Sequence, residues 1–303
     1  GFKTMDKILG ILENHGPLTG KALIEKTRID GFRLWKICYS NRSIIKKVIG
    51  TRYLRLDKQV DGYARLSPSI IREFYGYTII GTEKYLKEID KMGELLHQEV
   101  IEISRKKFKL AQEVVKKICE SQDDPHIIKK HACFIIAGDA AYEMSHLEPR
   151  PESSTGELVK GSDLDIVVVT QGLPASISKR LDLSIYNQKN LLLKNPSYKE
   201  EIDYIIKDIS KVERQLDFDN FESMVASKIL YEGKFLYGDM GIFNKIKEML
   251  FNKGIPVKLK VLEEKALMNR NNAISQLLKS QGTPSNQEDM KLFYTKEEKE
   301  EFF

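Results

Sequence analysis

The middle of the chain reads Lys160-Gly161-Ser162-Asp163-Leu164-Asp165-Ile166-Val167-Val168-Val169. The β-branched residues that close this stretch have high strand propensity and predict a buried strand. Side chains two residues apart on a strand point to the same side, so Asp163 and Asp165 are expected to converge while Leu164 faces the core. Two carboxylates held this close repel each other, and a divalent cation commonly relieves that repulsion. The alternative is a solvated loop before an ordinary core strand.

Length and composition indicate a globular chain with no membrane segment. The 303 residues are 41% hydrophobic and 31% charged, enough for two domains or one large one. No apolar run approaches the roughly 20 residues that span a bilayer. The net charge of +5 permits a polyanionic partner. Cys38, Cys119 and Cys133 are isolated and lack metal-site spacing, which argues against zinc and suits a reducing cytoplasm, the expected location.

Three predicted helices and a hairpin occupy the start of the chain. Apolar periodicity predicts helices over 5–15, over 19–27 and after Asp30-Gly31, and strand-like segments follow at 52–56 and 63–66. This order is typical of a winged helix, assigned to residues 1–82, with residues 31–42 in the recognition position. Basic side chains available for phosphates are Arg33, Lys36 and Arg42 from this helix and Arg55, Lys58 and Arg65 from the hairpin. A winged helix used for dimerisation or protein contact is the alternative.

A long helix is predicted to connect this region to the next. The helical pattern opens at Gly81-Thr82-Glu83 and continues to about Glu120, within a connecting segment assigned to 83–128. Its second half is basic, with Arg105-Lys106-Lys107, Lys109, Lys116 and Lys117. We interpret these residues as a solvated face, with nucleic-acid contact as the alternative.

The acidic strand belongs to a segment of alternating strands and helices, assigned to 129–240. The strand 133–137 ends in Gly138-Asp139, which is typical of a strand-to-helix turn, and the polar stretch 146–160 predicts a mobile loop. The strand 201–206 carries a third acid, Asp203. The other predicted elements are helices over 174–194 and 219–232, a strand over 234–237, C-terminal helices within 241–282 and a loosely held tail, 283–303.

This order of elements resembles the DNA polymerase β-like nucleotidyltransferase superfamily over roughly residues 130–240. The resemblance rests on Ser162-Asp163-Leu164-Asp165-Ile166, on Ile202-Asp203-Tyr204 and on the ending 229–238. It implies that Asp163 and Asp165 bind two Mg²⁺ ions, or Mn²⁺ in their place, and that Asp203 joins them at the nucleophile-side metal. It also implies that a nucleoside triphosphate lies against Lys160, Gly161, Ser162 and the turn Gly138-Asp139. A salt-bridging surface acid is the alternative for Asp203, and Asp182 and Asp208 are weaker candidates for the third ligand.

The turn departs from the superfamily pattern. Gly138 is followed by Asp139, whereas the superfamily usually has Gly-Ser or Gly-Gly, and an acid there repels a triphosphate unless it turns away or binds metal. Backbone N–H groups of the expected helix could still hold phosphate, and Ser145 or Ser162 could supply the hydroxyl. Lys160, Lys179 and Arg180 are candidates for neutralising the triphosphate charge, with a surface location as the alternative.

The expected acceptor comes from a second resemblance. A winged helix joined to a minimal nucleotidyltransferase resembles enzymes of bacterial toxin–antitoxin and anti-phage defence loci, and more weakly the nucleotidyltransferase of the Hailong defence system. This implies template-independent synthesis of an oligonucleotide from NTP or dNTP, a cognate effector protein as partner, and Tyr294 as a candidate acceptor hydroxyl. The alternative for Tyr294 is a docking residue.

The sequence also permits two rival functions. One is transfer of a single nucleotide to a protein or tRNA. The other is a DNA-binding regulator with an inactive nucleotidyltransferase fold. The predicted fold class is α+β: a winged helix, a long connecting helix, a small mixed nucleotidyltransferase sheet with helices, and a helical C-terminal region.

Overall fold

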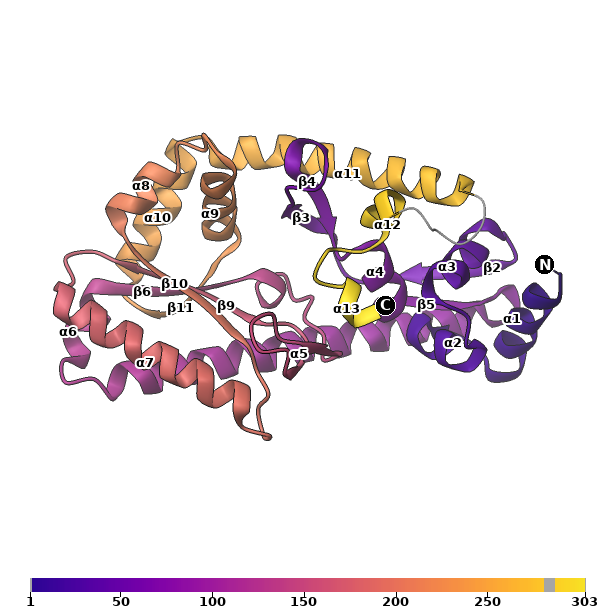
Figure 1. The fold of residues 1–303 in the computed structure, drawn as a ribbon, viewed down its shortest axis with the longest axis horizontal. Coiled ribbons are helices and arrows are strands. Elements are labelled where there is room, and N and C mark those ends of the chain that lie inside the picture. Colours follow the sequence, from indigo (N-terminus) through magenta and orange to yellow (C-terminus); the bar gives the residue numbers. More distant parts are fainter. Residues whose placement is uncertain (1, 281–286, 303) are drawn as a thin grey trace. The chain divides into compact units, whose positions relative to one another are not determined.

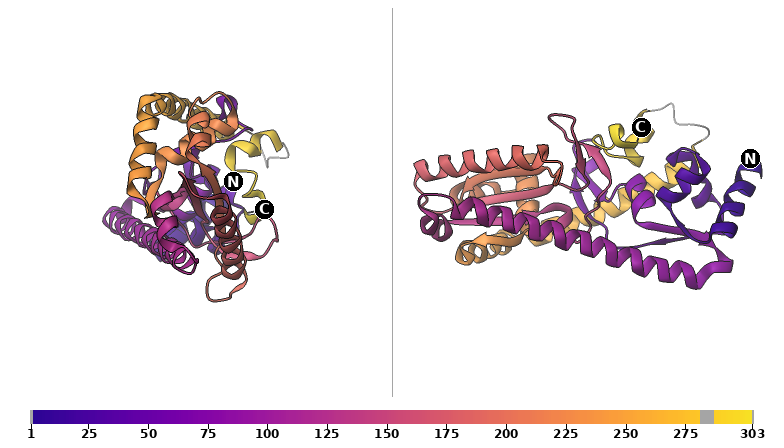
Figure 2. Two further views of the ribbon diagram at one scale, coloured as in Figure 1. Left: turned by 90° about the vertical axis from the view of Figure 1, so that its left-hand side faces the viewer. Right: turned by 90° about the horizontal axis from the view of Figure 1, so that it is seen from below.

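The protein is a mixed α+β chain with several small sheets. The computed structural model describes residues 2–280 and 287–302, which fall into two compact units (Figure 1). The first unit comprises residues 1–99 and 262–303, and the second comprises residues 100–261. Two helices belong partly to each unit, α5 (Leu86–Glu120) and α11 (Ile255–Lys279), and α5 is one unbroken helix (Figure 2).

The first unit begins with the three predicted helices. These are α1 (Phe2–His15), α2 (Gly20–Thr27) and α3 (Gly31–Ser40). The start points of α2 and α3 follow ordinary capping rules, because the Thr19 side chain accepts the N–H of Ala22 and the Asp30 side chain accepts the N–H of Arg33. The three helices therefore form where the apolar periodicity and the capping residues place them.

The sheet of the first unit differs from the prediction. Its order is β1 (Leu18–Thr19), β5 (Thr78–Thr82), β2 (Ile44–Val48), with antiparallel pairs. The expected hairpin exists as β3 (Tyr53–Leu56) and β4 (Ala64–Ser67), but these two strands form a separate sheet. The predicted helix start at Gly81-Thr82 was wrong, since both residues end β5. The 3₁₀ turn η2 (Glu83–Tyr85) then leads into α5, and α4 (Ile70–Gly76) precedes β5.

The described part of the C-terminal tail packs on the first unit, although its polar composition predicts a loose segment. It forms α12 (Gln287–Phe293) and α13 (Lys299–Phe302). Phe293 is fully buried, with its ring centroid 5.2 Å from that of Phe32 and 5.4 Å from that of Trp35. Both partners lie on α3, so the tail covers two aromatic side chains of that helix.

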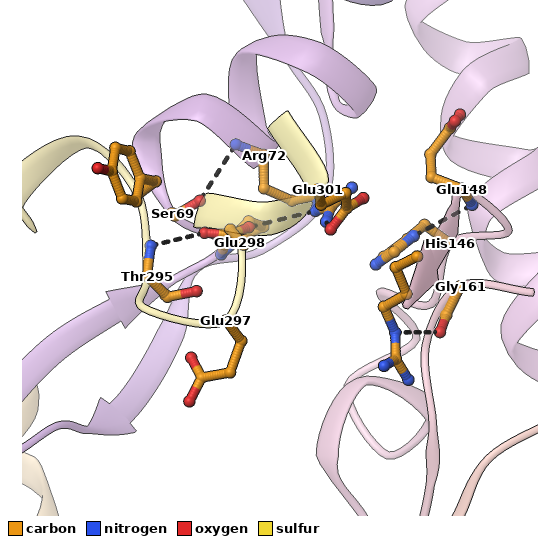
Figure 3. A network of polar contacts seen from close by, with 12 residues as sticks. Ser69, Arg72, His146, Glu148, Gly161, Thr295, Glu297, Glu298 and Glu301 are labelled. Atoms are coloured by element: carbon orange, nitrogen blue, oxygen red, sulfur yellow. Dashed lines mark hydrogen bonds and ion pairs between the residues drawn. The ribbon is translucent and has the colours of Figure 1, made fainter. Parts of the chain in front are cut away.

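An ion-pair network holds α13 as well. The Arg72 guanidinium pairs with Glu298 at 3.4 Å and with Glu301 (Figure 3). It also stacks on the Phe302 ring, 4.7 Å from its centroid. Glu298 also accepts the backbone N–H of Thr295 at 2.8 Å. The Arg72, Glu298 and Glu301 side chains are at most 12% exposed, so water screens these pairs weakly.

The second unit is built on a four-stranded sheet in the order β10-β9-β6-β11. Its strands are β6 (Ala132–Ala137), β9 (Leu164–Thr170), β10 (Ile202–Asp208) and β11 (Lys234–Gly238). β9 is parallel to β10 and antiparallel to β6, and β11 is antiparallel to β6. All residues of β6 and all but Asp165 of β9 are buried, which explains their nearly continuous apolar sequence.

Helices cover both faces of this sheet. Side chains of α5 and α7 (Ala175–Lys194) form one core with Leu164, Ile166 and Val168 of β9. The period of two places Asp163 and Asp165 on the opposite face. The remaining helices of the unit are α6 (Pro125–His131), α8 (Ile209–Gln215), α9 (Phe221–Glu232) and α10 (Met240–Asn252). Within residues 2–280 and 287–302, no helix is both long and apolar enough to cross a bilayer.

Candidate metal centre

Three carboxylates meet at one end of the two parallel strands. Asp163 immediately precedes β9, Asp165 is its second residue, and Asp203 is the second residue of β10. Asp165 and Asp203 are direct partners in the parallel register. One carboxylate oxygen from each of the three residues lies within 4.8 Å of the other two. The cluster offers hard oxygen ligands, which fit Mg²⁺ or Mn²⁺ better than zinc.

The local environment disfavours full ionisation of this cluster. Enclosure raises the pKa of Asp165 to about 7, with further contributions from the charges of Asp203 and Asp139. The pKa of Asp163 also lies well above its usual value, first because of enclosure and then because of the charge of Asp165. The cluster therefore retains a proton near neutral pH in the absence of a cation. A bound divalent cation would stabilise the ionised form and displace that proton.

The turn at Gly138 lies against the same carboxylates. Gly138 has φ +71°, and a Cβ at this position would lie 2.3 Å from Asp165 Oδ2, so only glycine fits. Its N–H donates to Glu232 Oε1 at 3.2 Å, and Glu232 is ion-paired with Lys228 at 2.8 Å. The structure therefore places this turn directly beside Asp165.

The helix expected after Gly138 was wrong. Residues 138–140 form a single 3₁₀ turn, η3, and no α-helix begins between residues 138 and 148. The N–H groups of Ala141 and Tyr142 donate to the Gly138 carbonyl, and that of Met144 donates to the Asp139 carbonyl. These donors are used within the turn, so an extended helical cradle for phosphate is not formed here.

Asp139 faces Ser162 across this site. Its Oδ2 accepts the Ser162 hydroxyl at 2.7 Å, and the Ser162 Oγ accepts the His146 N–H at 3.0 Å. The acid that breaks the expected Gly-Ser pattern therefore binds the chain's own serine. Asp139 still lies close enough to raise the pKa of Asp165.

Sequence reasoning missed Lys107, which lies beneath the loop that precedes Asp163. We predicted a solvated basic face for this part of α5, but the Lys107 side chain is only 3% exposed. Its ammonium donates to the backbone carbonyls of Lys160 and Ser162, both at 2.7 Å, and to Glu200 at 2.9 Å. The pattern contained a usable indication, because Lys107 sits at helical spacing within the buried stripe formed by Val100, Ser104, Ala111, Val115 and Ile118.

The polar stretch 146–160 is also more ordered than predicted. It contains the hairpin β7 (Pro149–Pro151) and β8 (Leu158–Lys160). The Glu152 carboxylate accepts hydrogen bonds from Ser154 and Thr155, which hold the turn and lower the pKa of Glu152 to about 2 despite the opposing effect of burial. Arg150 on β7 donates to the Gly161 carbonyl at 2.6 Å and pairs with Glu201 at 3.3 Å.

Several other candidates lie away from the three carboxylates. Arg180 pairs with Asp123 and Asp124, and Lys179 is its exposed neighbour on α7, which follows the far end of β9. Asp182 accepts the Tyr204 hydroxyl, and Asp208 caps α8, so neither competes as a ligand. Ser145 is fully buried, whereas Lys160 is exposed and donates its backbone N–H to the Lys199 carbonyl.

The basic residues proposed for phosphate contact in the first unit are in different environments. Arg33, Arg42 and Lys58 are exposed. Arg65 is buried, pairs with Asp57 and donates to the carbonyls of Leu292 and Tyr294, so it is removed from the candidate contacts. Lys36 donates to the Ser280 carbonyl and Arg55 pairs with Glu297. The exposed candidates among these residues are therefore Arg33, Arg42 and Lys58.

A scan against models of protein families and a search of curated proteins found no match to this chain.

Proposed function

We propose that this protein is a Mg²⁺-dependent nucleotidyltransferase of the DNA polymerase β-like type. The observation that carries the proposal is the convergence of Asp163, Asp165 and Asp203 from adjacent parallel strands, with ligand oxygens within 4.8 Å of one another. Two divalent cations about 3.5–4 Å apart would activate an acceptor hydroxyl and stabilise the leaving pyrophosphate. Asp163 and Asp165 would hold both cations, and Asp203 would hold the one on the nucleophile side.

The exposure of the acids suits this division of roles. Asp203 is exposed, whereas Asp163 and Asp165 are half-buried. An exposed carboxylate can approach an incoming hydroxyl and accept its proton, while the two enclosed carboxylates fix the cations. Glycine at 138 allows the turn to lie directly against Asp165, where the triphosphate is expected.

The charge that faces the triphosphate would come from residues other than those first expected. Lys228 lies beside the turn through its ion pair with Glu232, and its ammonium is 5.7 Å from the Tyr142 ring centroid. Arg150 lies near enough to Asp163 to lower its pKa. We propose Lys228 and Arg150 as the phosphate-facing cations, together with Ser162 and the Gly138 turn.

We propose template-independent oligonucleotide synthesis in anti-phage defence as the specific activity, and single-nucleotide transfer to a protein or tRNA as the alternative. Tyr294 remains the candidate acceptor hydroxyl for the first activity; it follows α12 directly and its side chain is half-buried. Intact mass after incubation with dNTPs and Mg²⁺ tests this role. Unchanged mass of the wild-type protein would remove Tyr294 as the acceptor.

One observation favours a second function, DNA binding without catalysis. The three helices and the sheet order β1-β5-β2 support a winged helix in which β2 and β5 form the wing strands and the hairpin β3–β4 is an insertion. The exposed Arg33 and Arg42 would contact phosphates. Phe293 covers Phe32 and Trp35 of α3, however, so contacts to bases from that side of the helix are excluded.

The deciding experiment incubates the full chain with each labelled NTP and dNTP and Mg²⁺, beside the variant Asp163→Ala/Asp165→Ala. A ladder that the variant loses would support oligonucleotide synthesis, and a single shifted band would support single transfer. If wild type and variant both leave every nucleotide unchanged, with nucleic acid and protein acceptors present, the enzyme proposal fails. Salt-dependent duplex binding would then favour the regulator.

A further inference from the structure

Three consecutive backbone carbonyls precede Asp163, and each accepts a hydrogen bond from a cationic side chain. Lys107 donates to the first and third of them, those of residues 160 and 162, at 2.7 Å each. Arg150 donates to the second, that of residue 161, at 2.6 Å. The path of the backbone into β9 is therefore fixed from two sides.

Each of these cations is in turn held by one of two consecutive glutamates. Glu200 accepts from Lys107 at 2.9 Å, and Glu201 pairs with Arg150 at 3.3 Å. The two glutamates immediately precede β10, whose second residue is Asp203. The two ion pairs consequently tie the start of β9 to the start of β10.

The side chains that tie the start of β9 to the start of β10 are mostly buried. The exposed side-chain fractions of Lys107, Glu200 and Glu201 are 3%, 9% and 4%, whereas the neighbouring Lys106 side chain is 76% exposed. A buried ammonium must satisfy its donors with well-placed acceptors, and its hydrogen bonds to charged or polar partners are strong and directional. The Lys107 ammonium has three such acceptors, so movement of the loop would leave part of its hydrogen-bonding capacity unused.

We propose that Lys107, Arg150, Glu200 and Glu201 form a carbonyl clamp that positions Asp163 relative to Asp203. The inference rests on the proposed metal centre, because its effect is on divalent-cation affinity. When the cluster loses its proton, as it must before a cation can bind, the carboxylates repel one another, and this ionised state favours a wider arrangement unless the backbone holds them. The clamp supplies that restraint. Its members position Asp163 rather than bind the cation, and Arg150 does so through its hydrogen bond to the Gly161 carbonyl in addition to the phosphate contact proposed above.

Lys107 gives the cleanest test of the clamp. Arg150 also lowers the pKa of Asp163 through its charge, so replacing it would change two properties together. We would measure Mn²⁺ binding to the full chain by electron paramagnetic resonance, which detects free Mn²⁺ and requires no enzymatic activity. The variants are Lys107→Met, Lys106→Met as the matched exposed control, and Lys107→Met/Glu200→Met, which removes the carboxylate left without its cation and adds no hydrogen-bond donor.

We expect Lys107→Met to weaken Mn²⁺ binding about 10- to 100-fold, as losses of residues that orient metal ligands commonly do. Lys106→Met should bind as the wild type does. The double variant should recover melting temperature but not Mn²⁺ affinity, because methionine has no N–H or O–H group in its side chain to replace the donors to residues 160 and 162. If Lys107→Met does not fold, the double variant carries the test.

Wild-type affinity in Lys107→Met, or recovery of affinity together with stability in the double variant, would overturn the clamp. A separate outcome addresses the metal centre itself. Wild-type protein that binds no Mn²⁺, or whose binding survives Asp163→Asn/Asp165→Asn, would refute the proposed metal centre and the clamp with it. Mn²⁺ binding that is lost in Asp163→Asn/Asp165→Asn but unchanged in Lys107→Met would refute the clamp and leave the metal centre standing.

Discussion

Asp165 and Asp203 lie directly opposite each other on the parallel strands β9 and β10. Side chains at paired positions of neighbouring strands project to the same face of the sheet, so the two carboxylates share one small volume. This arrangement is unfavourable for two anions and favourable for two ligands of one cation.

The affinity of the three carboxylates for a divalent cation should depend on pH. Because the pKa of Asp165 is raised to about 7, divalent-cation affinity should increase as pH rises through about 7, and binding below that pH should release protons. Calorimetric titration with Mn²⁺ in buffers of different ionisation enthalpy measures the released protons. Affinity that is constant between about pH 6 and 8 would contradict the raised pKa.

The raised pKa of Asp165 also makes the stability of the fold depend on pH. A carboxyl group whose pKa is raised on folding stabilises the fold while it is protonated, and this contribution is lost as pH rises through the folded-state pKa. In cation-free protein, Asp165→Asn should therefore raise the melting temperature of the second unit at pH 8 more than at pH 5. In Mg²⁺ the wild type should gain stability and the variant should gain less. A variant that responds to Mg²⁺ as the wild type does would contradict the role of Asp165 as a ligand.

The close approach of the Gly138 backbone to the Asp165 carboxylate can be tested by substitution. Gly138→Ala should destabilise the protein by about 2 kcal/mol or more, because φ is +71° and the new Cβ would meet Asp165 Oδ2. Gly156→Ala is the matched control, since Gly156 has φ +73° with no atom within 4 Å of its Cβ position. The control should show backbone strain alone, about 1 kcal/mol. Chemical denaturation of both variants measures the difference, and equal losses would show that the contact with Asp165 is unimportant.

Phe293 should contribute strongly to the first unit. Phe293→Ala should destabilise that unit by about 3–5 kcal/mol, because a fully buried ring packed on Phe32 and Trp35 is lost. Trp35 is the single tryptophan, so its fluorescence reports this transition during denaturation. Phe251→Ala is the control, since that side chain is 76% exposed and its loss should change little. Unfolding midpoints that coincide for the two variants would contradict the docking of α12.

Arg72 should anchor α13. In Arg72→Met the carboxylates of Glu298 and Glu301 lose their cation, so residues 295–302 should exchange amide hydrogens faster than in the wild type. Hydrogen–deuterium exchange with peptide resolution measures this change. Lys296→Met, at an exposed neighbouring position, should leave exchange in this segment unaltered. Unchanged exchange in Arg72→Met would mean that the network does not hold the helix.

The cysteines give a simple probe of native packing. Burial raises the pKa of Cys38, Cys119 and Cys133 to about 12 each, so none should react readily with a thiol reagent in the folded protein at neutral pH. All three should react in denaturant. Absorbance with a chromogenic disulfide reagent measures both rates. Rapid reaction of one thiol in the native protein would show that its surroundings are open.

The sequence predicts the candidate site better than it predicts the first unit. Asp163 and Asp165 are related by the two-residue period of one strand, and a short apolar strand carries Asp203. The local sequence pattern is therefore enough to select these three residues as candidates. The sheet β1-β5-β2 depends on pairing between residues 30 or more positions apart in sequence, such as Ile44 with Thr82. Two consecutive lysines in β2 and a glycine in β5 also interrupt the alternation of apolar and polar residues by which a strand is recognised in sequence.

The residues around the site were harder to predict for a related reason. Lys107 and Glu200 are far apart in sequence, and each looks like a surface residue when taken alone. Only the fold shows that they are buried against each other and against the loop before Asp163. The helix expected after Gly138 is not formed because the chain leaves helical geometry at Glu143, which has a left-handed φ of +56°.

The carbonyl clamp also has a consequence for how the sequence can change among relatives. If Lys107 exists to satisfy Glu200 and the loop carbonyls, relatives that replace one member of the pair should replace the other in the same lineage, and Arg150 and Glu201 should vary together in the same way. Two coupled pairs that flank an Asp-x-Asp strand form a far more selective search pattern than the two aspartates alone. Such a pattern would allow divergent relatives of this protein to be found where similarity along the whole chain has faded.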